Sequence, residues 1–262
     1  MIRALYSAAT GMQAQETNLD VISNNLANVN TTGFKKGRAD FQDLMYQYVM
    51  EPGAPTSQTS FNPTGIQVGL GVKTASVQKL FTQGDLSSTN NQLDVAIEGD
   101  GFFQITRPDG TLAYSRTGSF RLDQNGQLTT ADGFIVAPGI TVPPDALGVT
   151  IGQDGIVTVK QPNNAVPAQV GQLIGVRFPN NGGLRATGQG LYEETQASGA
   201  PVTGIFSQVG FGRLNQGFLE SSNVSVVEQV VNMITAQRAY EASSKGITTA
   251  DEMLTSAINL KR

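Results

Sequence analysis

The stretch from Ser225 to Leu260, SVVEQVVNMITAQRAYEASSKGITTADEMLTSAINL, decides the fold of this chain. Apolar residues recur in it every seven positions, and small residues follow four of them three places later: Val226, Met233, Tyr240, Ile247 and Leu254, with Ala236, Ser243, Ala250 and Ala257. This pattern is typical of a helix that packs closely along another helix. The spacing of Ser225 and Glu228 matches a capping box, which predicts that the helix begins there. At about 1.5 Å per residue, such a helix is roughly 50 Å long.

The first thirty residues carry the same spacing. Apolar residues again recur every seven positions, at Leu5, Met12, Leu19 and Leu26. The stretch that follows them is rich in Asn, Thr and Gly, which favour turns and helix ends. We therefore expect both ends of the chain to form heptad helices that pack together as a coiled-coil stalk. The alternative is that both helices pack on the chain's own central domain. Their length and the polar residues beside each stripe favour self-assembly with other copies.

Between these ends the apolar period changes from that of a helix to two, the period of a strand. Val68, Leu70 and Val72 alternate with other residues, and short apolar runs follow every eight to twelve residues. Three pairs of runs flank an Asp-Gly or Asn-Gly step, at Asp109, Asn125 and Asp154, and each step predicts a hairpin. The middle of the chain therefore predicts an antiparallel all-β domain, and the fold class that we expect is α+β.

A connecting segment separates the first helix from the β domain. Phe41, Leu44, Met45 and Tyr48 lie in a mixed stretch that favours a short helical or irregular arm. Residues 51–65 are rich in Pro, Gly, Ser, Thr and Gln and predict an extended loop. The division that we expect is therefore a terminal helical domain of 1–33 plus 223–262, a connecting segment of 34–70 and a β-rich domain of 71–222.

The composition argues against most chemistry. The 262 residues include no Cys, His or Trp, only 15% are charged, and the net charge is −4. Neither a Ser-His or Cys-His nucleophile nor a zinc site can be built from this inventory, and no basic field points to nucleic acid. We therefore expect no catalytic residue, no cofactor site, no metal site and no small-molecule substrate. The cluster of Lys35, Lys36 and Arg38 is typical of a solvated face.

Paired carboxylates are the remaining route to an enzyme, for example a wall-degrading glycosidase. Four aspartates each precede a glycine, where turn formation accounts for them: Asp100, Asp109, Asp132 and Asp154. Glu193 and Glu194 are neighbours in an expected strand and so point to opposite faces. The enzyme and a secreted β-rich binding module remain the alternatives from other functional classes. A binding module has no need of two long terminal heptads.

Several motifs resemble those of the bacterial flagellar rod and hook proteins. They are SAATGM at Ser7–Met12, NNLAN at Asn24–Asn28, TTGFK at Thr31–Lys35, AIEGDGFF at Ala96–Phe103 and MITAQRAYE at Met233–Glu241. They cover both ends and part of the middle. The length and the stretch from Tyr46 to Gly65 are most similar to a distal rod subunit of this family. A proximal rod subunit or the hook subunit is the alternative within the family.

This resemblance implies a non-enzymatic subunit of a stiff helical tube, which transmits motor torque to the hook and forms part of the export channel. The terminal helices would line the inner wall and the β domain would face outward. The implied partners are other copies, proximal rod and hook-side subunits, the periplasmic and outer-membrane rings, and the flagellar type III export apparatus. The implied location is the basal-body rod across the periplasm, reached without a cleaved signal peptide.

We assign two sets of residues to assembly. The heptad residues of both ends are expected to form the self-assembly seam. Residues of the connecting segment are expected to brace neighbouring subunits and keep the tube straight: Tyr46, Pro52, Gly53, Pro55, Pro63 and Gly65.

Overall fold

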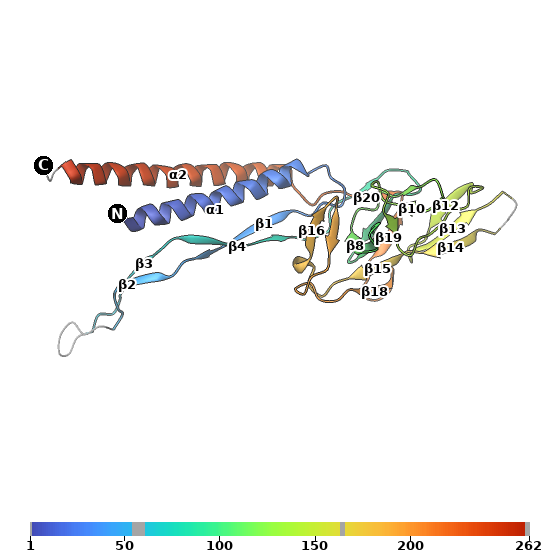
Figure 1. The fold of residues 1–262 in the computed structure, drawn as a ribbon, viewed down its shortest axis with the longest axis horizontal. Helices are drawn as coiled ribbons and strands as arrows, with labels where there is room; N and C mark the ends of the chain where they lie inside the picture. The colour runs from blue at the N-terminus through green and yellow to red at the C-terminus, as the bar shows by residue number, and fades with distance from the viewer. Residues whose placement is uncertain (1, 54–60, 163–165, 260–262) are drawn as a thin grey trace. The chain divides into compact units, whose positions relative to one another are not determined.

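In the computed structural model, which describes residues 2–53, 61–162 and 166–259, a long helix lies towards each end of the chain (Figure 1). Helix α1 spans Ile2–Ala27, with 26 residues, and helix α2 spans Val226–Asn259, with 34 residues. The backbone N–H of Glu228 donates a hydrogen bond to Ser225 Oγ at 3.5 Å, which confirms the predicted helix start. Among the described residues, no helix is both long and apolar enough to cross a membrane.

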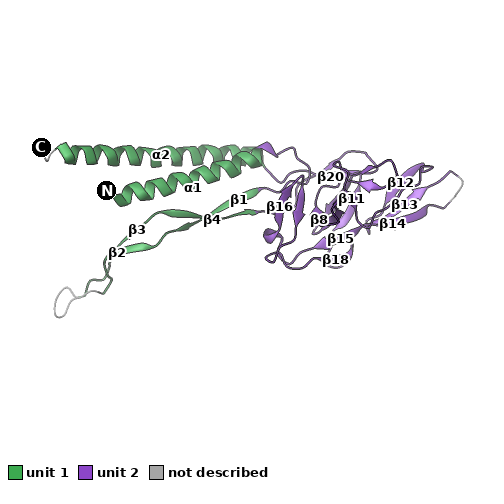
Figure 2. Cartoon of the chain, in the orientation of Figure 1, with its two compact units in different colours: residues 1–26, 37–78, 225–262 green, residues 27–36, 79–224 purple. Residues whose placement is uncertain are grey.

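The chain forms two compact units, coloured separately in Figure 2. Unit 1 combines residues 1–26, 37–78 and 225–262, and unit 2 combines residues 27–36 and 79–224. The terminal helices thus share a unit with the segment that follows the first helix. The three-part division expected from the sequence stays a prediction.

Helices α1 and α2 pack through small side chains. Ala14, Ala236 and Ala250 are buried. A methyl group added at Gly11 would lie 3.4 Å from Ser243 Oγ, and one added at Gly246 would lie 4.0 Å from Ala8 Cβ. These short separations show that the two backbones approach closely, as the row of small residues predicts.

Unit 1 also contains two antiparallel ribbons, and these replace the helical or irregular arm that we expected. Strand β1 (Gly37–Asp43) pairs with β4 (Val72–Lys79), and β2 (Tyr46–Met50) pairs with β3 (Ile66–Gly69). The expectation of a helical or irregular arm was wrong because β1 ends at Asp43 and its partner β4 begins only at Val72, beyond the reach of local propensity. The Asp40 carboxylate reinforces the first ribbon by accepting a hydrogen bond from Gln78 Nε2 at 2.9 Å.

Unit 2 is built of short strands, and most of its strands belong to one branched sheet. Along this sheet the strand order is β16 (Arg185–Gly188), β17 (Leu191–Glu193), β8 (Leu112–Ser115), β7 (Phe102–Thr106), β11 (Ile135–Val136), β10 (Leu128–Thr129) and β9 (Arg121–Leu122). Strand β15 (Ile174–Arg177) pairs with β7 and with β18 (Val202–Ile205). The smaller sheets are β12–β13–β14 (Gly148–Ile151, Ile156–Lys160, Ala168–Gln172), β6–β19 (Val95–Glu98, Arg213–Gln216) and β5–β20 (Leu86–Ser88, Phe218–Glu220).

The three predicted hairpins are present, as β7–β8, β9–β10 and β12–β13, and all three pairs are antiparallel. The glycine of each turn has a positive φ, between 75° at Gly126 and 84° at Gly155. Buried aromatic and aliphatic side chains form the core, including Phe103, Phe120 and Phe206. The α+β class expected from the sequence is confirmed.

Candidate functional site: the assembly surfaces

The predicted heptad residues of α1 and α2 are not the most deeply buried positions of the two helices. Most are partly covered, whereas Val226 and Tyr240 are exposed. In α2 the buried positions are Gln229, Ala236 and Ala250, and the two alanines belong to the small-residue row. The helix pair therefore uses small residues for its own contact and leaves much of the larger apolar surface available.

A second apolar row lies on the N-terminal half of α2, and the sequence analysis missed it. Val227, Val231 and Ile234 follow one another at a spacing of four and three residues, with Val230 beside them, and all four are exposed. Such spacing places them on one helix face. The signal was present in the sequence but was hidden beside the seven-residue pattern. This row is an unpartnered apolar surface of the chain alone.

The β2–β3 ribbon is exposed over nearly its whole length. Tyr46 and Tyr48 lie on one face, because residues two apart in a strand share a face. The register shifts between Tyr48 and Met50, so Met50 pairs with Ile66 and joins Val68 on the opposite face. Both faces of the ribbon therefore carry exposed apolar side chains, which is rare on the surface of an isolated protein.

The predicted brace residues belong to this ribbon and to the loop at its end. Tyr46 lies in β2, where a hydrogen bond to the Asp43 carboxylate raises the pKa of its hydroxyl group. A methyl group added at Gly65 would lie 2.5 Å from Met50 O, so the chain returns close to β2 at this position. Pro52, Gly53 and Pro63 lie in the loop, and Pro55 lies outside the described residues. Whether these residues contact a neighbouring subunit stays a prediction.

A buried ion cluster joins four distant segments of unit 2. Glu220, at the end of β20, forms ion pairs with Lys35 Nζ at 2.6 Å and with Arg116 Nε at 2.9 Å. The Glu220 carboxylate also accepts a hydrogen bond from the Gly84 N–H, and Lys35 Nζ donates to Thr82 O. The cluster therefore ties the segments after α1, after β4 and after β8 to one carboxylate in the segment before α2.

The location of Lys35 corrects a prediction. We expected Lys35 to lie on a solvated face with Lys36 and Arg38, but its side chain is 0% exposed. Its partner Glu220 is 185 residues away in sequence, so no local pattern announces the pair. Arg116 adds hydrogen bonds from Nη1 to Gly99 O and Gly101 O, both 2.8 Å long, and one from Nη2 to Ile97 O at 3.4 Å.

Burial and charge oppose each other in this cluster. Burial by itself would raise the pKa of Glu220, but the Arg116 and Lys35 cations outweigh this effect and hold the pKa below its usual value of 4.5. Burial lowers the pKa of Lys35, because the buried ammonium group loses its hydration, and the Glu220 carboxylate opposes that shift. Glu220 is therefore held as a carboxylate between two cations.

In unit 1, the buried side-chain amide of Asn25 forms a clasp that joins α1 to β1 and α2. Asn25, in the last turns of α1, exchanges two hydrogen bonds with the Gly37 backbone at 2.8 and 2.9 Å. Asn25 Nδ2 also donates to Gln229 Oε1 of α2 at 3.2 Å. The clasp therefore sets the register of α1 against both β1 and α2.

No metal-binding group of three or more His, Cys, Asp or Glu side chains occurs within residues 2–53, 61–162 and 166–259. Glu193, which was considered for acid chemistry, instead forms ion pairs with Arg107 and Arg185. The hydrogen bond from Arg185 lowers the pKa of the Glu193 carboxyl group most, and the hydrogen bond from Arg107 lowers it further. Its geometry is that of a surface ion pair.

Comparison with known proteins gives three family profiles that match this chain. The profile described as "Flagella basal body rod protein" matches residues 5–35. That described as "Flagellar hook protein FlgE/F/G D1 domain" matches residues 96–159, and "Flagellar basal body rod FlgEFG protein C-terminal" matches residues 215–260. The matched regions include α1, the core hairpins of unit 2 and α2.

Similarity to individual proteins extends over the whole chain. The flagellar basal-body rod protein FlgG of Borreliella burgdorferi is 52% identical over 264 residues, and that of Bacillus subtilis is 42% identical over 268 residues; both alignments cover 100% of each chain. The flagellar hook protein FlgE of Helicobacter mustelae is 45% identical over 137 residues, which are 52% of this chain and 30% of the hook protein. The similarity to the rod proteins therefore extends over the full length of the chain, whereas the similarity to the hook protein covers only part of it.

Proposed function

The chain belongs to the family of flagellar basal-body rod and hook proteins and is a distal rod subunit, and we propose that its copies assemble through the terminal helices into a stiff helical tube. The tube transmits motor torque to the hook and forms part of the export channel. The observation that carries this proposal is the apolar surface of α1 and α2 that the chain alone leaves uncovered. The work of this subunit is mechanical.

The seam between copies consists of the heptad residues that α1 and α2 only partly cover. Leu19 and Ile247 are partly buried within the chain, so a neighbouring helix can complete their burial. Burying the rest of such a side chain contributes on the order of 1 kcal/mol, and the contribution repeats in every subunit. The exposed row of Val227, Val231 and Ile234 offers a further helix-packing face.

The β2–β3 ribbon braces neighbouring subunits. Its two apolar faces give it the means to pack between two copies at once. Pro52 and Pro63, in the loop at its end, reduce the ordering cost of each contact. Packing of this kind opposes the sliding between subunits that bending requires. The alternative is that this segment is a surface loop without any contact to a neighbouring subunit. Deleting Gly53–Asn62, a stretch that includes the undescribed residues 54–60, should therefore leave unit 2 stable and make the tube more flexible.

The proposed partners are the subunits next to it in the flagellum and the machinery around the rod. These are proximal rod and hook-side subunits, the periplasmic and outer-membrane ring proteins, and the type III export apparatus that delivers the chain. The proposed location is the rod across the periplasm.

Electron microscopy of the concentrated protein tests the assembly proposal. The native chain should form straight tubes. Leu19→Asp places a charge in the packed seam, at a cost of several kcal/mol, and should abolish tubes and motility. Ser23→Asp adds the same charge on an exposed position of the same helix and serves as the control. Normal tubes from the Leu19 variant would show that the seam lies elsewhere.

A further inference from the structure

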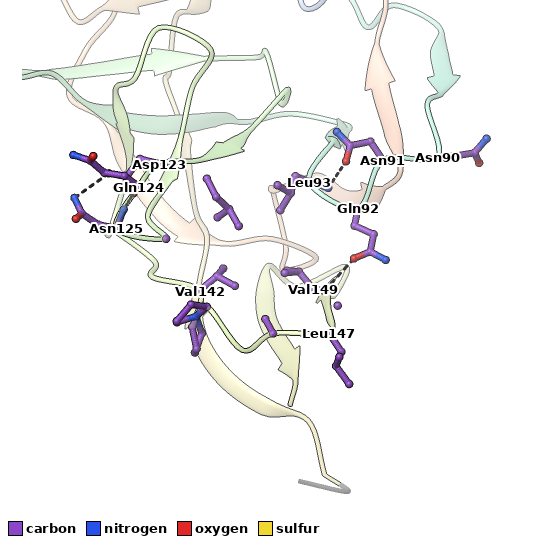
Figure 3. A pocket seen from close by; sticks show the side chains of 16 residues that line it. Asn90, Asn91, Gln92, Leu93, Asp123, Gln124, Asn125, Val142, Leu147 and Val149 are labelled. Atoms are coloured by element: carbon purple, nitrogen blue, oxygen red, sulfur yellow. Dashed lines mark hydrogen bonds between the residues drawn. The ribbon is translucent and has the colours of Figure 1, made fainter. Parts of the chain in front are cut away.

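Unit 2 contains a cavity of about 650 Å³ beside the start of β12. Its floor is apolar and includes Leu93, Leu122, Val142 and Val149, while Leu147 projects at its edge. Figure 3 shows Leu93, Val142 and Val149 between the turn at Asp123–Asn125 and the segment around Leu147. The cavity is therefore bounded by the β9–β10 turn on one side and by the start of β12 on the other.

The chemistry of the lining selects the kind of group that fits. Among the described residues that line the cavity there is no Lys, Arg or aromatic side chain, so it has neither a cation for an anionic ligand nor a ring on which a sugar could stack. Gln92 Oε1 is already engaged by the Val149 N–H at 3.2 Å, which caps the edge of β12 against an added strand. The lining also includes the polar side chains of Asn90, Asn91, Gln92, Asp123, Gln124 and Asn125. It therefore accommodates an apolar side chain together with the polar backbone of the turn that carries it.

The same unit displays an apolar side chain that nothing in the described chain covers. Val209 is 103% exposed, at the tip of the turn between β18 and β19. Hydrogen bonds from Phe211 N to Gln208 O, at 3.0 Å, and from Ser207 N to Gly212 O, at 2.9 Å, hold this turn rigid. Because the turn is already ordered, docking it loses little conformational entropy.

The charges around the two features are complementary. Arg177 donates from Nη1 to Gly210 O in the turn, and no carboxylate pairs with it among the described residues. Asp123 lines the cavity and Asp145 lies between two lining residues, and neither has a described Lys or Arg partner. The turn therefore brings a cation to a site bordered by carboxylates.

Within one copy the two features are held apart by β19. The turn directly precedes Arg213, where β19 begins, whereas Gln216, where it ends, donates from Nε2 to Gln92 O and Val149 O at the cavity. A copy therefore cannot place its own Val209 in its own cavity. Two different complementary surfaces on one chain make a head-to-tail contact, which is the kind that generates open helical assemblies.

We propose that the Val209 turn of one copy occupies the cavity beside β12 of the next copy in the rod. The proposal rests on the proposed function, because the occupant is a second copy of this chain. It adds a contact between β-rich units to the contacts between terminal helices.

Cysteine cross-linking tests the pairing, since the native chain has no Cys. The double variant Val209→Cys/Leu147→Cys, assembled into tubes and oxidised, should give a ladder of disulfide-linked oligomers, and each single variant should give none beyond a dimer. The same oxidation of dilute, unassembled double variant should give no ladder. Tubes of the double variant without a ladder would overturn the proposal while leaving the proposed function intact. A native chain that forms no tubes would contradict both.

A matched pair of charge variants gives an independent measurement. Val209→Asp should raise the critical concentration for tube formation about tenfold or more, because it removes the burial of one valine. Gln208→Asp adds the same charge one residue away, on an exposed side chain, and should raise it much less. Neither residue belongs to the core, so the melting temperature of both variants should equal that of the native chain. Equal critical concentrations for the two variants would overturn the proposal.

Discussion

Glu220 is the central residue of the buried ion cluster in unit 2. Two cations and a backbone N–H converge on its carboxylate, and its own carbonyl accepts a hydrogen bond from the Gly33 N–H at 2.8 Å. A buried ion cluster of this kind contributes little net stability compared with a well-packed apolar core, but loss of one partner strands the others. The cluster therefore acts as a specific connection between distant segments.

Replacing Glu220 tests this connection. Glu220→Gln keeps the shape but leaves Lys35 and Arg116 buried without a counter-charge, so the free energy of unfolding should fall by about 3–5 kcal/mol. Urea unfolding followed by circular dichroism measures the loss. Glu241→Gln is the control, because the Glu241–Arg238 pair is exposed and should contribute less than about 1 kcal/mol. Similar losses for both variants would contradict the role of the buried cluster.

The stability of the native protein should also depend on Glu220 in acid. Its pKa in the folded chain lies below the usual value of 4.5, so its contribution is fully present above that pH and is lost as the pH falls through the folded value. The difference in unfolding free energy between the native protein and Glu220→Gln should be constant from pH 7 to about 5 and shrink below about 4.5. A difference independent of pH down to 3 would mean that Glu220 is not held ionised.

Lys35 shows which part of the site the sequence could not disclose. Its partners, Thr82 and Glu220, lie far away along the chain, and their meeting depends on the completed fold. The helix cap at Ser225 and the turn at Asn125-Gly126 were predictable because each involves residues within a few positions. Strand β1 was missed for the same reason as Lys35: its pairing with β4 is non-local.

At the scale of elements, the β2–β3 ribbon is exceptional because its backbone is paired while its large apolar side chains lie exposed. Unit 2 buries its aromatic side chains in edge-to-face contacts, such as Phe103 with Phe120 at 5.0 Å. Tyr46 and Tyr48 of the ribbon remain exposed. Exposed apolar side chains on a two-stranded ribbon contribute to stability only if another copy covers them.

Removing the tyrosine side chains tests the brace. Tyr46→Ser/Tyr48→Ser should change the stability of the isolated chain by no more than about 0.5 kcal/mol, because both side chains are exposed. Its tubes should bend more easily, with a shorter persistence length in electron micrographs. Tyr46→Phe/Tyr48→Phe retains the apolar area and should retain the native stiffness. If the serine variant gave tubes as straight as the native ones, the ribbon would not be a brace.

At the scale of the whole molecule, the chain passes between its two units four times, after residues 26, 36, 78 and 224. The Glu220 cluster and the Asn25 clasp lie close in sequence to these passages, in unit 2 and unit 1 respectively. These four backbone connections are covalent routes along which torque can pass from one unit to the other. Fixing the chain on both sides of them is what a stiff subunit requires.

The central claim is that assembly covers the apolar surface of the terminal helices, and thiol labelling measures this directly. Val231→Cys introduces the only thiol of the chain on the exposed row of α2. It should react rapidly with a maleimide in dilute protein and at least about tenfold more slowly in tubes, where reaction requires local opening. Lys160→Cys, exposed on β13 of unit 2, is the control and should react at similar rates in both states. Equal labelling of Val231→Cys in dilute protein and in tubes would contradict the account.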